Sequence, residues 1–117
     1  GDMTEGLIHG LAHPKLARAL TAMHESPGTA WALGPMAKAA GMSRSAFAVE
    51  FKLQLGVTPA EYLLRWRVSL AQSMLLAGCS IKLASEKLGY ASAASFSRAF
   101  MQSVGMSPRA WLQTRQS

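Results

Sequence analysis

The sequence predicts an all-α fold of about seven helices, arranged as two helix-turn-helix subdomains joined by a long linker helix. Apolar residues recur at spacings of three and four along most of the chain, which is typical of amphipathic helices. No segment shows the alternation of polar and apolar residues that marks a β-strand. In addition, the stretch 33–63 recurs as 81–112, so the chain contains one unit twice.

The two copies share the residues that a helix-turn-helix needs at its turn and in its core. Gly41 and Gly89 occupy the two turns, and the second turn is one residue longer than the first. The other matched pairs are Phe47 with Phe96, Phe51 with Phe100, Gly56 with Gly105, Pro59 with Pro108 and Leu63 with Leu112. A helix-turn-helix places its second helix in the major groove of DNA. Two copies therefore predict a DNA-binding protein with two recognition helices.

Start and stop signals bound each element. Residues 1–12 are Gly-rich and poorly patterned, which predicts a linker or tail before a domain over residues 13–117. Pro14 suits the first position of a helix, and Ser43 and Ser92 are expected to cap the two recognition helices. The helices are expected over about 14–25, 32–40, 44–55, 59–77, 81–88, 93–104 and 108–112, with the first helix-turn-helix over about 14–57 and the second over about 80–115.

The linker helix over about residues 59–77 begins at Thr58-Pro59 and ends at Gly78. Its expected apolar stripe is Leu63, Trp66, Leu70, Met74 and Ala77. At 1.5 Å per residue the helix is about 28 Å long. Successive major grooves on one face of DNA lie about 34 Å apart. A stiff helix of this length is suited to hold two recognition helices about one turn of DNA apart.

The composition indicates a polyanionic partner. Charged residues make up only 15% of the 117 residues, yet the net charge is +6. This balance favours nucleic acid over a membrane, the alternative being ordinary solubility charge. Cys79 is the single cysteine, which excludes an internal disulfide and fits a reducing cytosol. No apolar run reaches the ~18 residues of a membrane span, and no secretion signal opens the chain.

Several motifs together resemble one family. The first copy contains Ala37-Lys38-Ala39-Ala40-Gly41-Met42-Ser43, Phe47-x-x-x-Phe51-Lys52, Gly56-Val57-Thr58-Pro59-x-x-Tyr62-Leu63 and Trp66-Arg67. The second contains Gly89-Tyr90, Phe96-Ser97-Arg98-x-Phe100 and Gly105-Met106-Ser107-Pro108-x-x-Trp111. Over residues 31–115 the chain is similar to the C-terminal DNA-binding domain of AraC/XylS-family transcription regulators.

The resemblance implies a monomeric domain whose two units bind neighbouring major grooves of double-stranded DNA. It also implies a cytoplasmic, nucleoid-associated regulator that contacts RNA polymerase in its full-length form. An N-terminal domain that senses an effector or dimerises usually accompanies this domain, and none is expected within these residues. One position departs from the pattern, since Val49 stands where relatives often have a basic or polar residue. The departure implies weak base reading by the first unit.

The Phe pairs are expected to lie in the core, which turns the opposite face of each recognition helix outward. The expected base-facing residues are Ser45, Ala48, Val49, Ala94, Ser97 and Arg98. Small and apolar side chains can touch a thymine methyl group or let the backbone come close, but they give little hydrogen-bond information. Arg98 fits the O6/N7 edge of guanine with two hydrogen bonds, the alternatives being a phosphate contact or an internal ion pair.

Phosphate contacts are expected at helix N-termini and at basic side chains near them. The candidates are Ser43, Arg44, Lys52, Thr58, Arg67, Lys82, Ser92, Ser107 and Arg109. Helix capping alone is a sufficient role for the hydroxyls among them. We therefore expect the first unit mainly to position the domain through Arg44 and Lys52, and the second unit to read sequence through Arg98.

An enzyme is not expected, because the six carboxylates are scattered singly and Cys79 has no accompanying catalytic motif. His9 and His13 have a spacing that can bind a metal on a helix, but they flank Gly10 and lack a third ligand nearby. Neither a metal nor a cofactor is predicted. The stronger alternative to DNA binding is a helical protein-interaction module, since helix-turn-helix folds are sometimes reused in that way.

Overall fold

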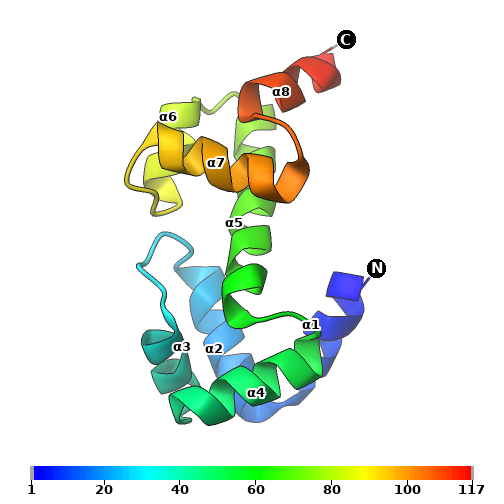
Figure 1. The fold of residues 1–117 in the computed structure, drawn as a ribbon, viewed down its shortest axis with the longest axis vertical. Coiled ribbons are helices and arrows are strands. Elements are labelled where there is room, and N and C mark those ends of the chain that lie inside the picture. Colours follow the sequence, from blue (N-terminus) through cyan, green and yellow to red (C-terminus); the bar gives the residue numbers. More distant parts are fainter. Residues whose placement is uncertain (1, 117) are drawn as a thin grey trace. The chain divides into compact units, whose positions relative to one another are not determined.

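The computed structural model describes residues 2–116, which form eight helices and no strand (Figure 1). The helices are α1 (Asp2–Ala12), α2 (Pro14–Glu25), α3 (Leu33–Ala40), α4 (Arg44–Leu55), α5 (Pro59–Leu76), α6 (Ile81–Lys87), α7 (Ala93–Val104) and α8 (Pro108–Gln116). The predicted all-α class is confirmed, and α1 is the element that the prediction lacked. Within the described residues, no helix is long and apolar enough to cross a membrane.

The prediction of a linker or tail over residues 1–12 is wrong for residues 2–12, which form α1. Gly6 and Gly10 lie four residues apart on the buried side of this helix, and α1 contacts α4. A Cβ atom added to Gly6 would lie 2.5 Å from the carbonyl oxygen of Leu55, so only glycine permits this close approach. The glycines that suggested an unstructured segment are therefore helix-packing residues.

The chain divides into two compact units. The first contains the residues up to Ser26 together with Ala30–Leu63, and the second contains Pro27–Thr29 and the residues from Leu64 onward. The helix α5 contributes its first turn to the first unit and the rest to the second. Each unit has a core of its own.

The core of the first unit is formed by the buried faces of α2, α3 and α4 and by Tyr62 on α5. Its most buried large side chains are Leu16, Leu20, Met23, Met36, Phe47, Phe51 and Tyr62. The hydroxyl of Tyr62 forms a hydrogen bond with Nε2 of His24, at 2.5 Å. Burial raises the pKa of Tyr62 to about 12 and lowers the pKa of His24 from its ordinary value.

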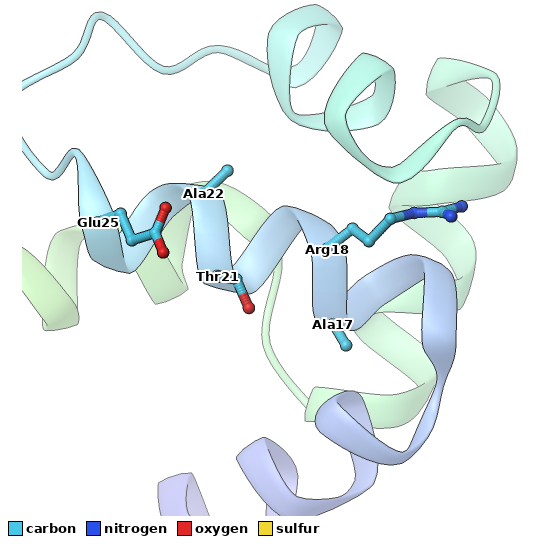
Figure 2. Close-up of a pocket in the computed structure, with 5 residues that line it drawn as sticks. All are labelled: Ala17, Arg18, Thr21, Ala22 and Glu25. Carbon is cyan, nitrogen blue, oxygen red and sulfur yellow. The ribbon is translucent and has the colours of Figure 1, made fainter.

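On the outer side of α2, the side chain of Arg18 reaches toward the turn after α3, as Figure 2 shows. Its Nη2 atom donates a hydrogen bond to the carbonyl oxygen of Ala40, at 3.2 Å. This carbonyl belongs to the last turn of α3, where backbone oxygens lack partners within the helix and where a cation is favoured by the helix dipole. Arg18 thereby stabilises the end of α3 that leads into the turn.

The core of the second unit contains Val68, Ala71, Leu75, Ala84, Leu88, Phe96, Phe100 and Trp111. The buried side chains of α5 in this unit are Val68, Ala71 and Leu75. The predicted stripe of this helix is therefore only partly right: Leu63 is buried, Leu70 and Met74 pack at the margin of the core, and Ala77 lies beyond the last helical residue. One straight stripe assumed one packing surface, whereas α5 contributes side chains to two cores.

Candidate nucleic-acid interface

The turn between α3 and α4 has the geometry of a helix-turn-helix. Gly41 adopts a left-handed conformation with φ of 70°, which glycine accepts without steric cost. The N–H of Met42 donates to the carbonyl oxygen of Ala37 and the N–H of Gly41 to that of Lys38, both at 3.0 Å. This pair of bonds closes the helix as a Schellman motif. The chain then enters α4, which Ser43 caps.

The turn between α6 and α7 repeats this arrangement in the second unit. Gly89 has a φ of 83°, and the N–H of Tyr90 donates to the carbonyl oxygen of Ser85 at 3.0 Å. The additional residue of this turn lies between the helix end and Ser92, which caps α7. There Ser92 and Ser95 form a capping box, in which each side chain accepts from the backbone N–H of the other.

The Phe pairs hold each recognition helix against its unit, as predicted. Phe47, Phe51, Phe96 and Phe100 are all fully buried. In the first unit the ring of Phe51 meets Tyr62 edge to face at 5.7 Å between centroids, and in the second Phe100 meets Trp111 at 5.8 Å. Tyr62 and Trp111 are matched positions of the repeat, so the same aromatic contact occurs at the same place in both units.

The face opposite the Phe pair is accessible on both helices. Of the six predicted base-facing residues, Ser45, Val49, Ala94 and Arg98 are exposed, and Ala48 and Ser97 are half-buried. The exposed faces of α4 and α7 differ in their capacity to form hydrogen bonds. Val49 is 68% exposed on α4, and its match on α7 is Arg98.

Sequence reasoning missed Leu53, which lies one turn after Val49 on α4 and is 71% exposed. Its match on α7 is Gln102, which is also exposed. The signal was present in the four-residue spacing of Ser45, Val49 and Leu53, which places them on one side of a helix.

The four hydroxyl candidates for phosphate contact all cap helices. The side-chain oxygens of Ser43, Thr58, Ser92 and Ser107 each accept a hydrogen bond from the backbone N–H three residues later, at 3.1 to 3.2 Å. Ser80 does the same for α6, a cap that the prediction lacked. These bonds fix the helix starts and leave first-turn N–H groups without partners inside the helix. Such groups favour an anion.

The basic candidates fall into two groups. Arg44, Lys82 and Arg109 are exposed in the first turns of α4, α6 and α8. Arg44 also lines an open depression together with Lys38 and Ser43 at the turn of the first unit. The amine of Lys52 donates to the carbonyl oxygen of Gly56 at 3.2 Å, so it has a local partner at the end of α4.

Arg67, for which the sequence predicts a phosphate contact, has partners within its own unit. Its Nε donates to the carbonyl oxygen of Pro27 at 2.8 Å, and its Nη2 donates to that of Thr29 at 2.6 Å. The guanidinium also lies 5.6 Å from the centre of the Tyr90 ring, a cation–π distance. Arg67 therefore holds the segment Pro27–Thr29 within the second unit, and its phosphate contact stays a prediction.

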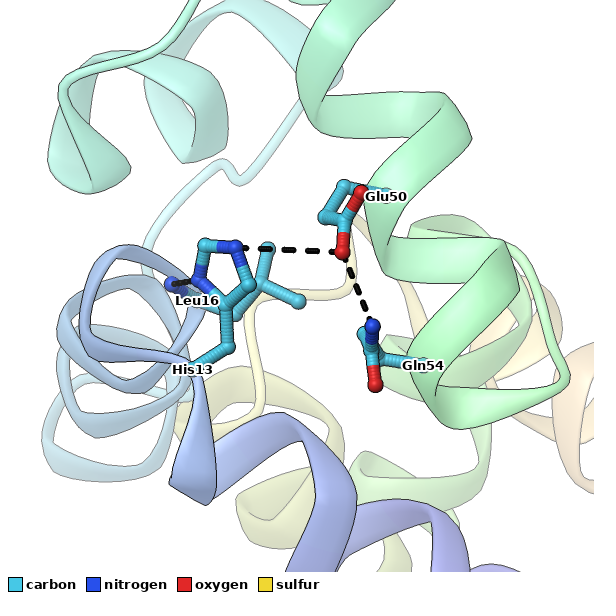
Figure 3. A network of polar contacts seen from close by, with 4 residues as sticks. All are labelled: His13, Leu16, Glu50 and Gln54. Atoms are coloured by element: carbon cyan, nitrogen blue, oxygen red, sulfur yellow. Dashed lines mark hydrogen bonds and ion pairs between the residues drawn. The ribbon is translucent and has the colours of Figure 1, made fainter.

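The single carboxylate of α4 faces away from its exposed stripe. Figure 3 shows Glu50 directed toward His13 and Gln54. Its Oε1 accepts from Nε2 of Gln54 at 2.9 Å and lies 3.8 Å from Nε2 of His13. His13 itself caps α2 through Nδ1, which accepts from the N–H of Leu16. Across the part of the chain that the structure describes, no group of three or more His, Cys, Asp or Glu could hold a metal ion.

Comparison with known proteins places this geometry among helix-turn-helix proteins. A family model described as a helix-turn-helix domain matches residues 36–114. The chain is 39% identical over 108 residues to a putative AraC-like transcription regulator of Streptomyces antibioticus, covering 92% of this chain and 36% of that protein. It is 36% identical over 105 residues to the RCS-specific HTH-type transcriptional activator RclR of Escherichia coli strain K12, covering 89% and 37%. The chain thus spans about a third of the length of the curated relatives it matches.

Solved structures show the same fold. The DNA-binding domain of AdpA, a global transcriptional factor, was solved in complex with a target DNA and is similar with a TM-score of 0.77 at 26% identity, covering 84% of this chain and 88% of that one. An AraC-type regulator from Chromobacterium violaceum gives 0.75 at 27% identity, covering 85% and 89%. The C-terminal domain of AraT, a response regulator from Geobacillus stearothermophilus, gives 0.82 at 25% identity, covering 86% and 85%.

Proposed function

The chain belongs to the AraC family of helix-turn-helix DNA-binding domains of transcriptional regulators, and we propose that it reads two successive major grooves of one asymmetric site. The observation behind this proposal is that one chain holds two helix-turn-helix units with unlike outward faces. Two unlike units need no two-fold axis in the DNA, in contrast to dimeric helix-turn-helix proteins. The AdpA domain, similar over most of this chain, was solved with target DNA, which supports the same use of the fold here.

The length of α5 supports the spacing that the proposal requires. The helix is 18 residues long without interruption, which corresponds to about 27 Å at 1.5 Å per residue. Successive major grooves lie about 34 Å apart. We therefore expect the preferred site to have two halves about one helical turn of DNA apart.

Hydrogen-bond readout is assigned to the second unit. Arg98 is exposed on α7, and among the described residues it has no ion pair or hydrogen bond that would hold it elsewhere. A guanidinium can donate two parallel hydrogen bonds to the O6/N7 edge of guanine. The matched Val49 cannot donate any. Ser45, Ala48, Ala94 and Ser97 complete the base-facing set as small contacts that allow close approach.

Phosphate binding is assigned to both units. The first turns of α4 and α7 offer unpartnered N–H groups beside Ser43 and Ser92, with Thr58 and Ser107 at the starts of α5 and α8. Arg44, Lys52, Lys82 and Arg109 add positive charge near these ends. In a full-length regulator we expect RNA polymerase as a further partner, in the cytoplasm where the chromosome lies.

The test compares Arg98→Ala with Lys52→Ala on a site selected from a random DNA pool and on its single-base variants, at several salt concentrations. Arg98→Ala should cost about 1–3 kcal/mol on the best site and relax the preference at one base pair. Lys52→Ala should weaken all sequences about equally and lower the salt slope by roughly one unit. Arg44→Ala is a second phosphate variant, because Lys52→Ala also removes the bond to Gly56.

Three outcomes would contradict the assignment. If Arg98→Ala weakens every sequence alike, Arg98 binds phosphate and specificity must come from DNA shape and small residues. If Lys52→Ala and Arg44→Ala both leave the salt slope unchanged, the first unit does not position the domain through these cations. If the chain shows no salt-dependent DNA binding and instead binds a protein partner, the interaction-module alternative holds.

A further inference from the structure

The recognition helix of the first unit exposes an apolar stripe. Val49 is 68% exposed and Leu53 is 71% exposed, the two highest values among the exposed large hydrophobic side chains of the described chain. They lie four residues apart on one side of α4, in line with the exposed Ser45. The matched stripe on α7 is Ala94, Arg98 and Gln102. These two adjacent aliphatic side chains leave apolar surface in water, which a contact with an apolar group would cover.

The charges around this stripe indicate what kind of surface it meets. Lys38, Arg44 and Lys52 are exposed on α3 and α4. The single carboxylate of these two helices is Glu50, which is directed toward His13 and Gln54 (Figure 3). The stripe is thus apolar with cations around it. A surface complementary to this stripe would present apolar groups bordered by negative charge.

The major groove of a thymine-containing duplex has this arrangement. The C5-methyl group of thymine is the apolar group on that edge, and phosphates border the groove on both sides. A folded protein partner would more commonly present an apolar patch with a mixed polar rim. The absence of a hydrogen-bond donor at Val49 and Leu53 also fits a methyl group, which needs none.

Resting on the function proposed above, we propose that the first unit selects thymine through its C5-methyl groups, with Val49 and Leu53 as the residues that contact them. Four residues of helix rise about 6 Å, while bases on one strand are about 3.4 Å apart. Two methyl groups contacted by this pair should therefore lie about two base steps apart. The first unit then reads sequence by apolar contact while the second reads it by hydrogen bonds.

The test replaces single thymines in the selected site with deoxyuridine, which lacks only the C5-methyl group. Each contacted methyl should contribute about fourfold to Kd, and two such positions should appear in the half of the site that the first unit covers. In Val49→Ala, deoxyuridine at one of these positions should cost nothing further, because the contact is already lost. Leu53→Ala should do the same at the other position.

The matched control is Leu76→Ala, which shortens an aliphatic side chain that is 58% exposed near the end of α5. This variant should keep the full deoxyuridine penalty at both positions. Melting curves accompany all variants, and alanine favours helix at these exposed sites, so unfolding is not the expected result.

The possible failures are distinguishable. If the chain binds its selected site with the expected salt dependence and every deoxyuridine substitution is neutral, the methyl contact is wrong while DNA binding stands. If Val49→Ala and Leu53→Ala fold normally and keep wild-type affinity, the stripe does not contribute to DNA binding, and the inference is overturned. If no selected site is bound at all, the proposed function itself fails.

Discussion

Replacing Phe100 by alanine should destabilise the second unit by about 3–5 kcal/mol. The ring is fully buried, and its centroid lies 5.9 Å from that of Phe96 and 5.8 Å from that of Trp111. The substitution removes a buried ring and, with it, two aromatic pairs. Each such pair contributes about 0.5–1.5 kcal/mol to stability beyond the contribution of its buried area. A small domain has a total stability of only about 5–15 kcal/mol. The loss is therefore a large part of the total.

Amide hydrogen exchange followed by mass spectrometry resolves where the stability is lost. Protection of the α7 and α8 amides should fall by a factor of about a hundred to several thousand, which is 3–5 kcal/mol expressed as an equilibrium constant. Amides of α2 and α4 should keep most of their protection, because Phe100 is in the core of the second unit. Phe51→Ala is the mirror control, with the loss in the first unit.

Two results would contradict the placement of Phe100 in a core of the second unit. Equal loss of protection throughout the described chain in both variants would mean that the two units unfold together and that the effect of Phe100 is not confined to its own unit. Wild-type melting of Phe100→Ala together with lost DNA binding would mean that the ring contacts DNA and is not a core residue.

Two further predictions follow from particular contacts. Arg67→Ala removes the donors to the carbonyl oxygens of Pro27 and Thr29, and should lower stability by about 1–3 kcal/mol. Arg67→Lys should recover only part of the lost stability, because an ammonium group cannot reproduce the planar guanidinium that donates to both carbonyl oxygens. Unchanged thermal melting of Arg67→Ala would contradict this structural role of Arg67. Burial lowers the pKa of His24 below 6.5, so the unfolded chain binds more protons as the pH falls through 6.5 toward the lower folded value. Stability should therefore decrease over that pH window, and His24→Gln should show a shallower dependence in melting curves from pH 5 to 8. An identical pH dependence of the melting temperature in the wild type and His24→Gln would contradict this contribution of His24.

Much of the architecture follows from local sequence signals. In the sequence repeat, α3 corresponds to α6 and α4 corresponds to α7. The spacing of the Phe residues identified the buried side of each recognition helix. Capping residues such as Ser43 and Ser92 fixed the helix starts to within a residue. These features were predictable because each depends on residues close together in the chain.

The features that sequence reasoning missed depend on contacts between distant residues. Gly6 looked like part of a flexible tail because its role is defined only by the backbone of Leu55. The structural role of Arg67 was not predicted because its carbonyl partners lie about forty positions earlier in the sequence. Leu53 received no role from the sequence, because its exposure depends on which side of α4 packs against the unit.

A hydroxyl-radical footprint of this chain on a DNA site selected from a random pool, combined with the stoichiometry of the complex, tests whether both units read one site. We expect one chain per duplex on an asymmetric site, with two protected regions about one helical turn apart. Protection of a single short region, or a palindromic site bound only by two chains together, would contradict the claim that both units read one site.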